Sequence, residues 1–352
     1  MGYVAGVDLG ATNVRAAVAD DDGDVLATAV EPTPQGPGGI QVTEAVLSAL
    51  RAACADAVVD PTDCRAAGVG AVGPLDLAAG GVRNPANLPD TIDWIPLTGP
   101  VGELVGSDRV YLHNDADAGV IGERFYSERN PDDMVYLTLS SGIGAGVAVD
   151  GHVVSGWDGN AGEVGHMTLD PQELMTCGCG KDGHWEAYCS GENIPDYARL
   201  LHEQGCARGG DGDGSEDGDG SADIGRGEGP ADGAAGTDTD LPLADPEFDA
   251  ADVFAHAGAD PFADHVVDQL AHWNTMGVAN VVHAYAPIVV SVGGAVALNN
   301  ESLVVDPVRD RLDEMLFVNR PDVRLTRFGD DVVVRGAVAS ALTGGTGDRR
   351  RL

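Results

Sequence analysis

The feature that most restricts the fold of this chain is a group of four side chains of the kinds that bind metal ions. These are His166, Cys177, Cys179 and His184. Zn²⁺ binds four sulfur or imidazole ligands in a tetrahedron, and a site without an open position is usually structural. Two carboxylates, Glu163 and Glu186, are interleaved with the four ligands in the segments EVGH and CGCGKDGHWE. The pattern predicts a structural zinc site that fixes two glutamates beside it.

The composition excludes some classes of function. The chain has 352 residues, enough for two domains at roughly one per 100–200 residues. Its 20 Lys and Arg residues face 57 Asp and Glu residues, for a net charge of −37, and Lys181 is the only lysine. No basic face can form to bind nucleic acid. An acidic, lysine-poor surface suits a cytoplasm with molar salt, where counter-ions screen the self-repulsion, so we expect a halophilic source.

The sequence predicts a cytoplasmic protein that does not act at a membrane. The apolar segment 3–9 is too short for a signal peptide or a membrane span, and Asp8 interrupts it. Cys54, Cys64 and Cys206 are scattered along a long chain, which does not indicate a secreted disulfide framework. We expect these three cysteines to be reduced.

Apolar patterns predict two similar α/β halves. In the first half we expect strands at 3–9, 14–19, 25–30, 66–73 and 110–115, a helix at 40–57, and a helix from Asp115 or just beyond. In the second half we expect a strand at 134–140, a glycine turn at 141–147, a continuation into 153–156, a strand at 287–294, and helices at 249–258, 261–285, 303–315 and 331–343. Both halves begin with a strand, a glycine turn and another strand. Facing halves would place the two turns across a cleft.

Residues 209–240 differ from the rest of the chain. They are almost entirely Gly, Asp, Ala, Ser and Glu, with Ile224 as the only large apolar side chain. Such a segment cannot bury enough surface to offset its ordering entropy, so we expect a disordered acidic insert. Calcium binding is the alternative, although the segment lacks the terminal glutamate spacing of an EF-hand loop.

Three glycine turns, each after an apolar strand, indicate a nucleotide site. In DLGATNVR (8–15), Asp8 suits Mg²⁺ held through water, and the residues after it allow close approach of phosphates. SSGIGAG (140–146) is the second turn, and SVGGAVA (291–297) the third, where a base or ribose could lie against bare backbone. Each turn alone is also typical of an ordinary hairpin. The candidate nucleotide-binding residues are Asp8, Gly10, Thr12, Asn13, Ser141, Gly142, Gly144, Gly293 and Gly294.

Taken together, these motifs resemble those of the ROK family (repressors, open reading frames and sugar kinases). DLGATNVR and LTLSSGIGAGV resemble its two phosphate motifs, HNDADAG its sugar and catalytic motif, and EVGH with CGCGKDGHWE its zinc signature. The resemblance covers nearly the whole chain apart from the acidic insert. It implies the two-domain sugar-kinase/actin-like ATPase fold, with ribonuclease H-like halves and a cleft between them. We expect domains at 1–115 and 116–330, with a last helix at about 331–346 packed on the first.

The resemblance also implies roles for residues. Asp115 would be the general base that accepts the proton of the attacking sugar hydroxyl. Read from the residue alone, Asp115 is better explained as a helix N-cap, and Asp117 as a first-turn helix charge. The residues that resemble the family's sugar ligands are Asn87, Asn114, Asp115, Glu163, His166 and Glu186. His166 would bind zinc through one ring nitrogen and face the sugar with the other.

The chain departs from the family pattern at His184, where a third cysteine is usual. Imidazole can replace a thiolate in a tetrahedral zinc site, giving Cys₂His₂. Cys189 is the alternative fourth ligand.

The resemblance implies an ATP-dependent, Mg²⁺-requiring glucokinase with Zn²⁺, which acts on a sugar and a nucleotide as a homodimer or higher homo-oligomer. Another hexose or an N-acetylhexosamine as substrate, and another phosphoryl donor, stay open. A repressor would carry an N-terminal helix-turn-helix, for which the strand at Tyr3 leaves no room. A non-catalytic sugar sensor is the remaining alternative.

Overall fold

The structure, a computed structural model, describes residues 2–85, 87–210 and 238–352. Its strands form two five-stranded sheets and one small three-stranded sheet. The strands are β1 (Tyr3–Leu9), β2 (Asn13–Asp20), β3 (Val25–Pro32), β4 (Cys64–Ala71), β5 (Leu75–Asp76), β6 (Gly81–Arg83), β7 (Trp94–Pro96), β8 (Val110–Asn114), β9 (Met134–Leu139), β10 (Ile143–Val149), β11 (His152–Val153), β12 (Val289–Gly293) and β13 (Asp322–Leu325).

The helices flank these sheets. They are α1 (Gly39–Asp56), α2 (Thr98–Val105), α3 (Asp115–Tyr126), α4 (Glu186–Cys189), α5 (Ile194–Gly210), α6 (Ala250–His256), α7 (Pro261–Tyr285), α8 (Ala295–Asn299), α9 (Glu301–Val304), α10 (Asp306–Met315) and α11 (Val332–Thr343). Short 3₁₀ helices are η1 (Pro61–Asp63), η2 (Val164–His166), η3 (Gly329–Asp331) and η4 (Arg349–Arg351). Within the described ranges, no helix is both long and apolar enough to cross a lipid bilayer.

The two large sheets have the same topology. Their orders are β3-β2-β1-β4-β8 and β11-β10-β9-β12-β13. In each sheet, neighbours among the first three strands of this order are antiparallel. The last two strands are parallel to the third, which is β1 in one sheet and β9 in the other. The predicted repeat of two α/β halves is therefore confirmed.

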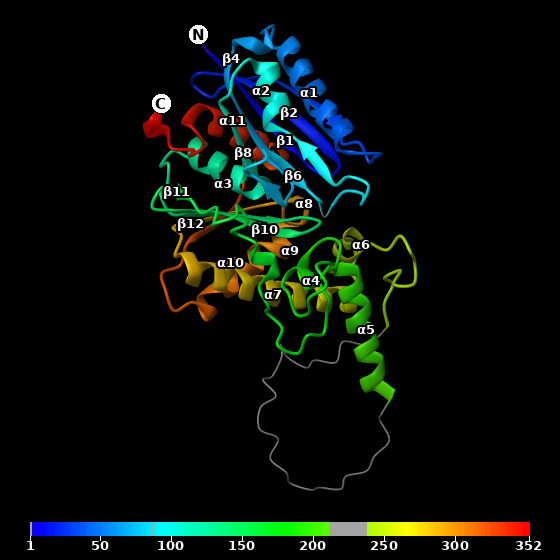
Figure 1. The fold of residues 1–352 in the computed structure, drawn as a ribbon. Coiled ribbons are helices and arrows are strands. Elements are labelled where there is room, and N and C mark those ends of the chain that lie inside the picture. Colours follow the sequence, from blue (N-terminus) through cyan, green and yellow to red (C-terminus); the bar gives the residue numbers. More distant parts are fainter. Residues whose placement is uncertain (1, 86, 211–237) are drawn as a thin grey trace.

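The molecule is layered, with helices on both faces of each large sheet (Figure 1). Helices α1 and α2 cover the outer face of the first sheet, where alternate residues of β1 such as Ala5 and Val7 are buried. Helices α3 and α11 lie between the two sheets, and Val4 of β1 packs in their cluster. Helix α7 covers the outer face of the second sheet. Because both faces are covered, the central strands are nearly continuous apolar runs.

Helices α3 and α11 touch through small residues. A methyl group on Gly336 of α11 would lie 1.7 Å from the carbonyl oxygen of Ala118 in α3, and one on Gly122 would lie 2.9 Å from the Gly336 nitrogen. Helix α11 also packs closely on the first sheet, since a methyl group on Gly68 of β4 would lie 2.0 Å from the Ala337 carbonyl oxygen. The C-terminal helix thus completes the inner layer of the first sheet.

Some sequence-based expectations were wrong in extent. The predicted glycine turn at 141–147 is confined to the residues before Ile143, where β10 begins. Gly146 allows close packing in that strand, because a methyl group there would lie 2.0 Å from the Ala116 carbonyl oxygen. The expected helix at 303–315 is divided into α9 and α10. Most of the acidic segment 209–240 lies outside the described residues.

Candidate functional site

The first glycine turn joins β1 to β2, and side chains that follow β3 form hydrogen bonds with its backbone. The Gly10 N–H donates to the Asn13 carbonyl at 3.0 Å, the Thr33 hydroxyl donates to the Gly10 carbonyl at 2.7 Å, and the Gln35 amide donates to the Ala11 carbonyl at 3.0 Å. No described group accepts a hydrogen bond from the backbone N–H of Ala11 or Thr12. Two adjacent free N–H groups are suited to a phosphate oxygen.

An ion pair that the sequence analysis missed lies beside this turn. Asp8 and Arg15 are direct cross-strand partners in β1 and β2. Arg15 Nη1 lies 3.6 Å from Asp8 Oδ2, and Arg15 Nη2 lies 3.5 Å from Asp330 Oδ2. Asp8 is only 6 % exposed, and this burial raises its pKa to about 7, although Arg15 opposes the shift. The hairpin register of DLGATNVR could have revealed the pairing of its first and last residues.

The second glycine turn lies between β9 and β10. The Ser140 N–H donates to the Gly142 carbonyl at 2.9 Å, and the Ile143 N–H donates to Glu186 Oε2 at 2.7 Å. No acceptor for the N–H groups of Ser141 and Gly142 exists among the described residues. Gly144 lies within β10 instead of the turn, where a methyl group would be 3.9 Å from Ala116 Cβ. The second turn therefore also offers two adjacent N–H groups.

The third glycine pair, at the end of β12, is required by packing. A methyl group on Gly293 would lie 2.3 Å from Tyr136 Oη, and one on Gly294 would lie 2.3 Å from the Leu139 carbonyl oxygen. Gly294 also has φ 87°, a conformation that favours glycine. Close contact with β9 thus accounts for both glycines without a ligand.

Asn114 and Asp115 lie where β8 ends and α3 begins. Asn114 is the N-cap: its Oδ1 accepts a hydrogen bond from the Ala116 N–H at 2.9 Å. Asp115, the first residue of α3, accepts from the same N–H at 2.8 Å. The N-cap of α3 is therefore Asn114, and not Asp115 as the alternative interpretation of the sequence would have it. Burial raises the pKa of the half-buried Asp115 carboxyl, which makes it a stronger base.

Asp117 is in the first turn of α3 as expected, but it is buried. It is 4 % exposed, and no described residue forms a hydrogen bond with its carboxyl group. Burial, followed by the charges of Asp115 and Glu163, raises its pKa to about 8. A neutral carboxylic acid thus lies next to Asp115 at neutral pH.

The four predicted metal ligands lie together. One ligand atom from each of His166, Cys177, Cys179 and His184 lies within 4.8 Å of the others. Cys177 Sγ is 3.7 Å from His166 Nδ1, and Cys179 Sγ is 3.3 Å from His184 Nδ1. In a tetrahedral zinc site, sulfur and nitrogen ligands are about 3.5 Å apart, so these residues fit the ion.

The alternative fourth ligand, Cys189, lies elsewhere. It belongs to α4, and its Sγ faces the Leu270 carbonyl oxygen at 3.7 Å. It is not part of the ligand group.

Two glutamates border the ligand cluster as the spacing predicts. His166 directs Nδ1 to the cluster, and its Nε2 lies 4.0 Å from Glu163 Oε2. Glu186 Oε1 accepts from the Cys177 thiol at 3.5 Å, while Oε2 holds the Ile143 N–H. Glu186 therefore connects the ligand cluster to the second glycine turn.

Asn87, the remaining predicted sugar ligand, is exposed in the loop that follows β6. No described residue forms a hydrogen bond with its side-chain amide. Its assignment as a sugar ligand stays a prediction.

Residues 4–343 match the ROK family profile. The chain belongs to the ROK family. A glucokinase of Pyrobaculum calidifontis is 34% identical over 341 residues, which cover 97% of this chain and 95% of that protein. The crystal structure of a ROK hexokinase from Thermus thermophilus has a TM-score of 0.73 and 31% identity, covering 96% of this chain and 97% of that one.

A second ROK structure is the glucokinase of Streptomyces griseus in complex with glucose and AMPPNP. It has a TM-score of 0.67 and 29% identity, covering 97% of this chain and 99% of that one. This chain of the ROK family thus has the sugar-kinase/actin-like ATPase fold that the motifs predict.

Proposed function

We propose that this ROK-family protein is a glucokinase that transfers the γ-phosphoryl group of ATP to glucose, giving glucose 6-phosphate. The observation that carries this proposal is the position of Asp115. Its half-buried carboxyl follows directly after β8, and its charge adds to burial in raising the pKa of both Asp8 and Glu163. A potential base therefore lies near both the end of β1 and the predicted sugar ligands. The similarity to glucokinases along almost the entire chain supports the same reaction.

The nucleotide phosphates bind to the two glycine turns. The free N–H groups of Ala11 and Thr12 on one side, and of Ser141 and Gly142 on the other, donate to phosphate oxygens. Gly10 and Asn13 close the first turn, and Asp8 holds Mg²⁺ through water. When bound, Mg²⁺ neutralises charge on the phosphates. Gly144, Gly293 and Gly294 support the turns and the neighbouring strand packing, with β12 expected beside the base or ribose.

Asp115 orients the sugar hydroxyl and accepts its proton as the hydroxyl attacks the phosphorus atom. Phosphoryl transfer depends mainly on positioning and charge neutralisation, and a carboxylate that orients the nucleophile is a recurring part of such sites. Asn114 leaves its Nδ2 free to donate to the sugar because only Oδ1 caps α3.

The other sugar contacts come from Glu163, His166 Nε2, Glu186 and Asn87. The ring of His166 is oriented because Nδ1 faces the cysteine cluster, which leaves Nε2 directed towards Glu163. The exposed Asn87 amide forms no hydrogen bond with a described residue and is free to donate to the sugar and to accept from it.

His166, Cys177, Cys179 and His184 hold a structural Zn²⁺ ion. The mixed thiol and imidazole donor set and its spacing support this ion over oxygen-preferring Mg²⁺. Burial lowers the pKa of His184, which favours the neutral imidazole that a metal requires. The ion supplies a fixed point from which His166 and Glu186 extend.

The kinase consists of domains 1–115 and 116–330, and 331–346 returns to the first. The packing of α11 against β1 and β4 supports this division. The protein works in a cytoplasm of high salt, which its net charge of −37 supports. It forms a homodimer or a higher homo-oligomer, as the resemblance to the family implies.

The test is ATP-dependent phosphorylation by the purified protein in molar KCl with Mg²⁺. Glucose, mannose, N-acetylmannosamine and N-acetylglucosamine are compared, and we expect the highest kcat/KM with glucose. Turnover only on another sugar would support the proposed mechanism and show that glucose is not the substrate. A folded, zinc-loaded protein without turnover on any of these sugars would contradict the kinase proposal.

A further inference from the structure

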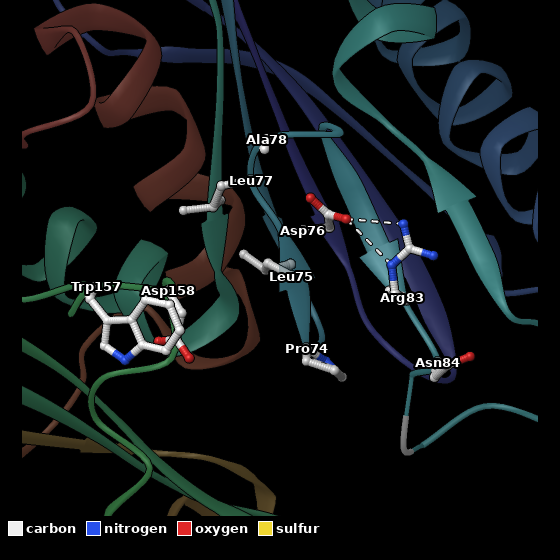
Figure 2. A pocket seen from close by; sticks show the side chains of 9 residues that line it. All are labelled: Pro74, Leu75, Asp76, Leu77, Ala78, Arg83, Asn84, Trp157 and Asp158. Carbon is white, nitrogen blue, oxygen red and sulfur yellow. Dashed lines mark hydrogen bonds and ion pairs between the residues drawn. The ribbon is translucent and has the colours of Figure 1, made fainter.

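A pocket of about 470 Å³ adjoins the proposed sugar site but contains none of its predicted ligands. Small-molecule sites usually have volumes of roughly 300–1,000 Å³. The walls come from two distant parts of the chain (Figure 2). One wall is the segment from Pro74 through β5 and β6 to Asn84, and the other carries Trp157 and Asp158.

The apolar part of the pocket is formed by Trp157 and Leu77. Trp157 is 95 % exposed and Leu77 is 47 % exposed, so both offer apolar surface to a ligand. The two walls touch at Gly159, where a methyl group would lie 2.9 Å from Leu77 Cδ1. An indole has a flat apolar face and a polar N–H edge, which suits a ligand with both apolar and polar surfaces.

The pocket also contains a fixed donor, Arg83. Its Nε and Nη2 donate to Asp76 Oδ2 at 3.3 and 3.0 Å, and its guanidinium carbon lies 5.1 Å from the centre of the Trp94 ring. These contacts hold the guanidinium plane in place. Its Nη1 has no acceptor among the described residues and is free to donate to a ligand.

Two further polar groups are available. Asn84 has φ 48°, its N–H donates to the Asp93 carbonyl at 2.9 Å, and no described residue forms a hydrogen bond with its side-chain amide. Asp158 accepts one hydrogen bond through Oδ1, from the Asn160 N–H at 3.2 Å, which leaves Oδ2 open. The pocket therefore presents a free donor and acceptor amide as well as a carboxylate oxygen.

The charges of the pocket indicate the class of ligand. Asp76 and Asp158 outnumber the single guanidinium of Arg83, so the pocket disfavours phosphates and other anions. A pyranose ring is neutral, has an apolar C–H face, and carries hydroxyls that both donate and accept. Those properties match an exposed indole beside the Asp158 carboxylate on one wall, with the Asn84 amide and the Arg83 guanidinium on the other wall.

The pocket also lies next to the first sugar site. Pro74 follows Gly73, where a methyl group would be 3.5 Å from Asn114 Nδ2. Asn84 begins the loop that contains Asn87, and Asp158 precedes Glu163 in the same loop region. Two sugar rings could therefore bind side by side, one in each site.

We propose that this pocket binds a second glucopyranose ring, with its C–H face on Trp157 and a hydroxyl on Asp158, while Arg83 and Asn84 line the other wall. The inference rests on the proposed function for the sugar at the first site. The ring has two possible sources: a second molecule of free glucose, or the second unit of a glucose disaccharide whose other unit occupies the first site.

The test is calorimetric titration of the full chain, without nucleotide, with glucose and with maltose, alongside tryptophan fluorescence. Free glucose as the source predicts two binding events, and Trp157→Ala should weaken the second about tenfold, as loss of an aromatic anchor commonly does. A disaccharide as the source predicts that one maltose binds per chain and that Trp157→Ala weakens this binding to a similar extent. A single glucose event with no maltose binding, or binding unaffected by Trp157→Ala, would overturn the proposal.

Three variants sharpen the test. Asn84→Gly removes the amide while keeping the left-handed backbone, and Asp158→Asn removes the charge; each should weaken the second ring by a smaller factor. Phe317→Ala is the control, because Phe317 is 96 % exposed and is not part of the pocket. If sugar binding depends on Trp157 but glucose is never phosphorylated, the proposed kinase function fails and the second ring site stands.

Discussion

The two strand-turn-strand hairpins of the molecule share a backbone plan and differ in where their charges come from. In the first hairpin, Leu9 pairs with Val14, and the next pair is Asp8 with Arg15. In the second, Leu139 pairs with Ile143, and the next pair is Thr138 with Gly144. The charged pair of the first hairpin thus has no charged equivalent in the second.

The second hairpin instead receives its carboxylate from outside. Glu186 reaches it from the ligand cluster and accepts the Ile143 N–H at 2.7 Å. Both hairpins have two N–H groups in their turns without an acceptor among the described residues, so the duplicated fold has the same pair of free donors twice. Side chains distinguish the two hairpins: the first has an internal ion pair, and the second is linked to the Cys/His cluster.

The largest effect should come from the carboxylate of Asp115, which belongs to neither hairpin. If the hairpins only bind the nucleotide and Asp115 acts as the base, Asp115→Asn should lower kcat by about 10³-fold, within the usual range for a general base. Binding of Mg²⁺-ATP, measured by calorimetry, should change little. Asp56→Asn, an exposed aspartate at the end of α1, is the control. A kcat within a factor of about three of the wild type would exclude Asp115 as the base.

Removing the charge of the first hairpin should have the next largest effect. Arg15→Ala removes the cation beside Asp8, and we expect kcat/KM for Mg²⁺-ATP to fall by about 10²-fold, because charge-assisted bonds contribute roughly 1.5–3 kcal/mol. Arg15→Lys should restore part of the loss. Arg65→Ala, which breaks an exposed pair with Asp21, should leave the kinetics unchanged. Equal kinetics for Arg15→Ala and Arg65→Ala would show that the two hairpins do not differ in this way.

The second hairpin should respond to loss of the metal cluster instead. Cys177→Ser removes one of the four predicted ligands, which lies 3.5 Å from Glu186 Oε1, and we expect the zinc content to fall and KM for ATP to rise about tenfold. Zinc is measured by mass spectrometry and KM by steady-state kinetics. Cys189→Ser, outside the ligand group, should retain the metal. Full zinc occupancy in Cys177→Ser would contradict the assigned ligand set.

The smallest effect concerns Asp117, next to Asp115. Burial raises its pKa from 3.8 to about 8, so the native state binds a proton that the unfolded chain releases near pH 4. The stability that this proton supplies is therefore complete below about pH 4 and is lost as the pH rises to about 8. Asp117→Asn should raise Tm relative to the wild type by a few degrees at pH 9 and by less at pH 4, at constant salt. An equal difference at both pH values would contradict this assignment.

Long apolar strands could be predicted from the sequence, whereas short or glycine-rich ones could not. β1, β9 and β12 are buried runs that the pattern identifies directly. β13 has only four residues, two of them charged, and β5, β6 and β7 have two or three residues each, so no periodicity develops. In β10, Gly146 reflects contact with the α3 backbone, a tertiary feature that local propensity cannot reveal.

The Cys/His cluster was the most predictable part of the site because its four side chains are close in sequence and of distinctive chemistry. The pairing of Arg15 with Asp8 follows from strand register and could have been predicted. Its pairing with Asp330, over 300 positions away, could not be predicted from the sequence. The burial of Asp117 depends on how α3 packs between the sheets. The domain limits and the roles of the ligands remain predictions.

The return of α11 to the first sheet has a consequence for synthesis on the ribosome. The strands of that sheet are complete once residue 114 has been made, but the helix that covers their inner face begins only at Val332. During translation of the intervening residues, Val4, Ala17 and Ala66 lack their final apolar partners. Nascent domains usually fold in order from the N-terminus, but the inner face of this half stays partly uncovered until the last helix has been synthesised. Truncating the chain even slightly before α11 should therefore damage the first half synthesised more than the last.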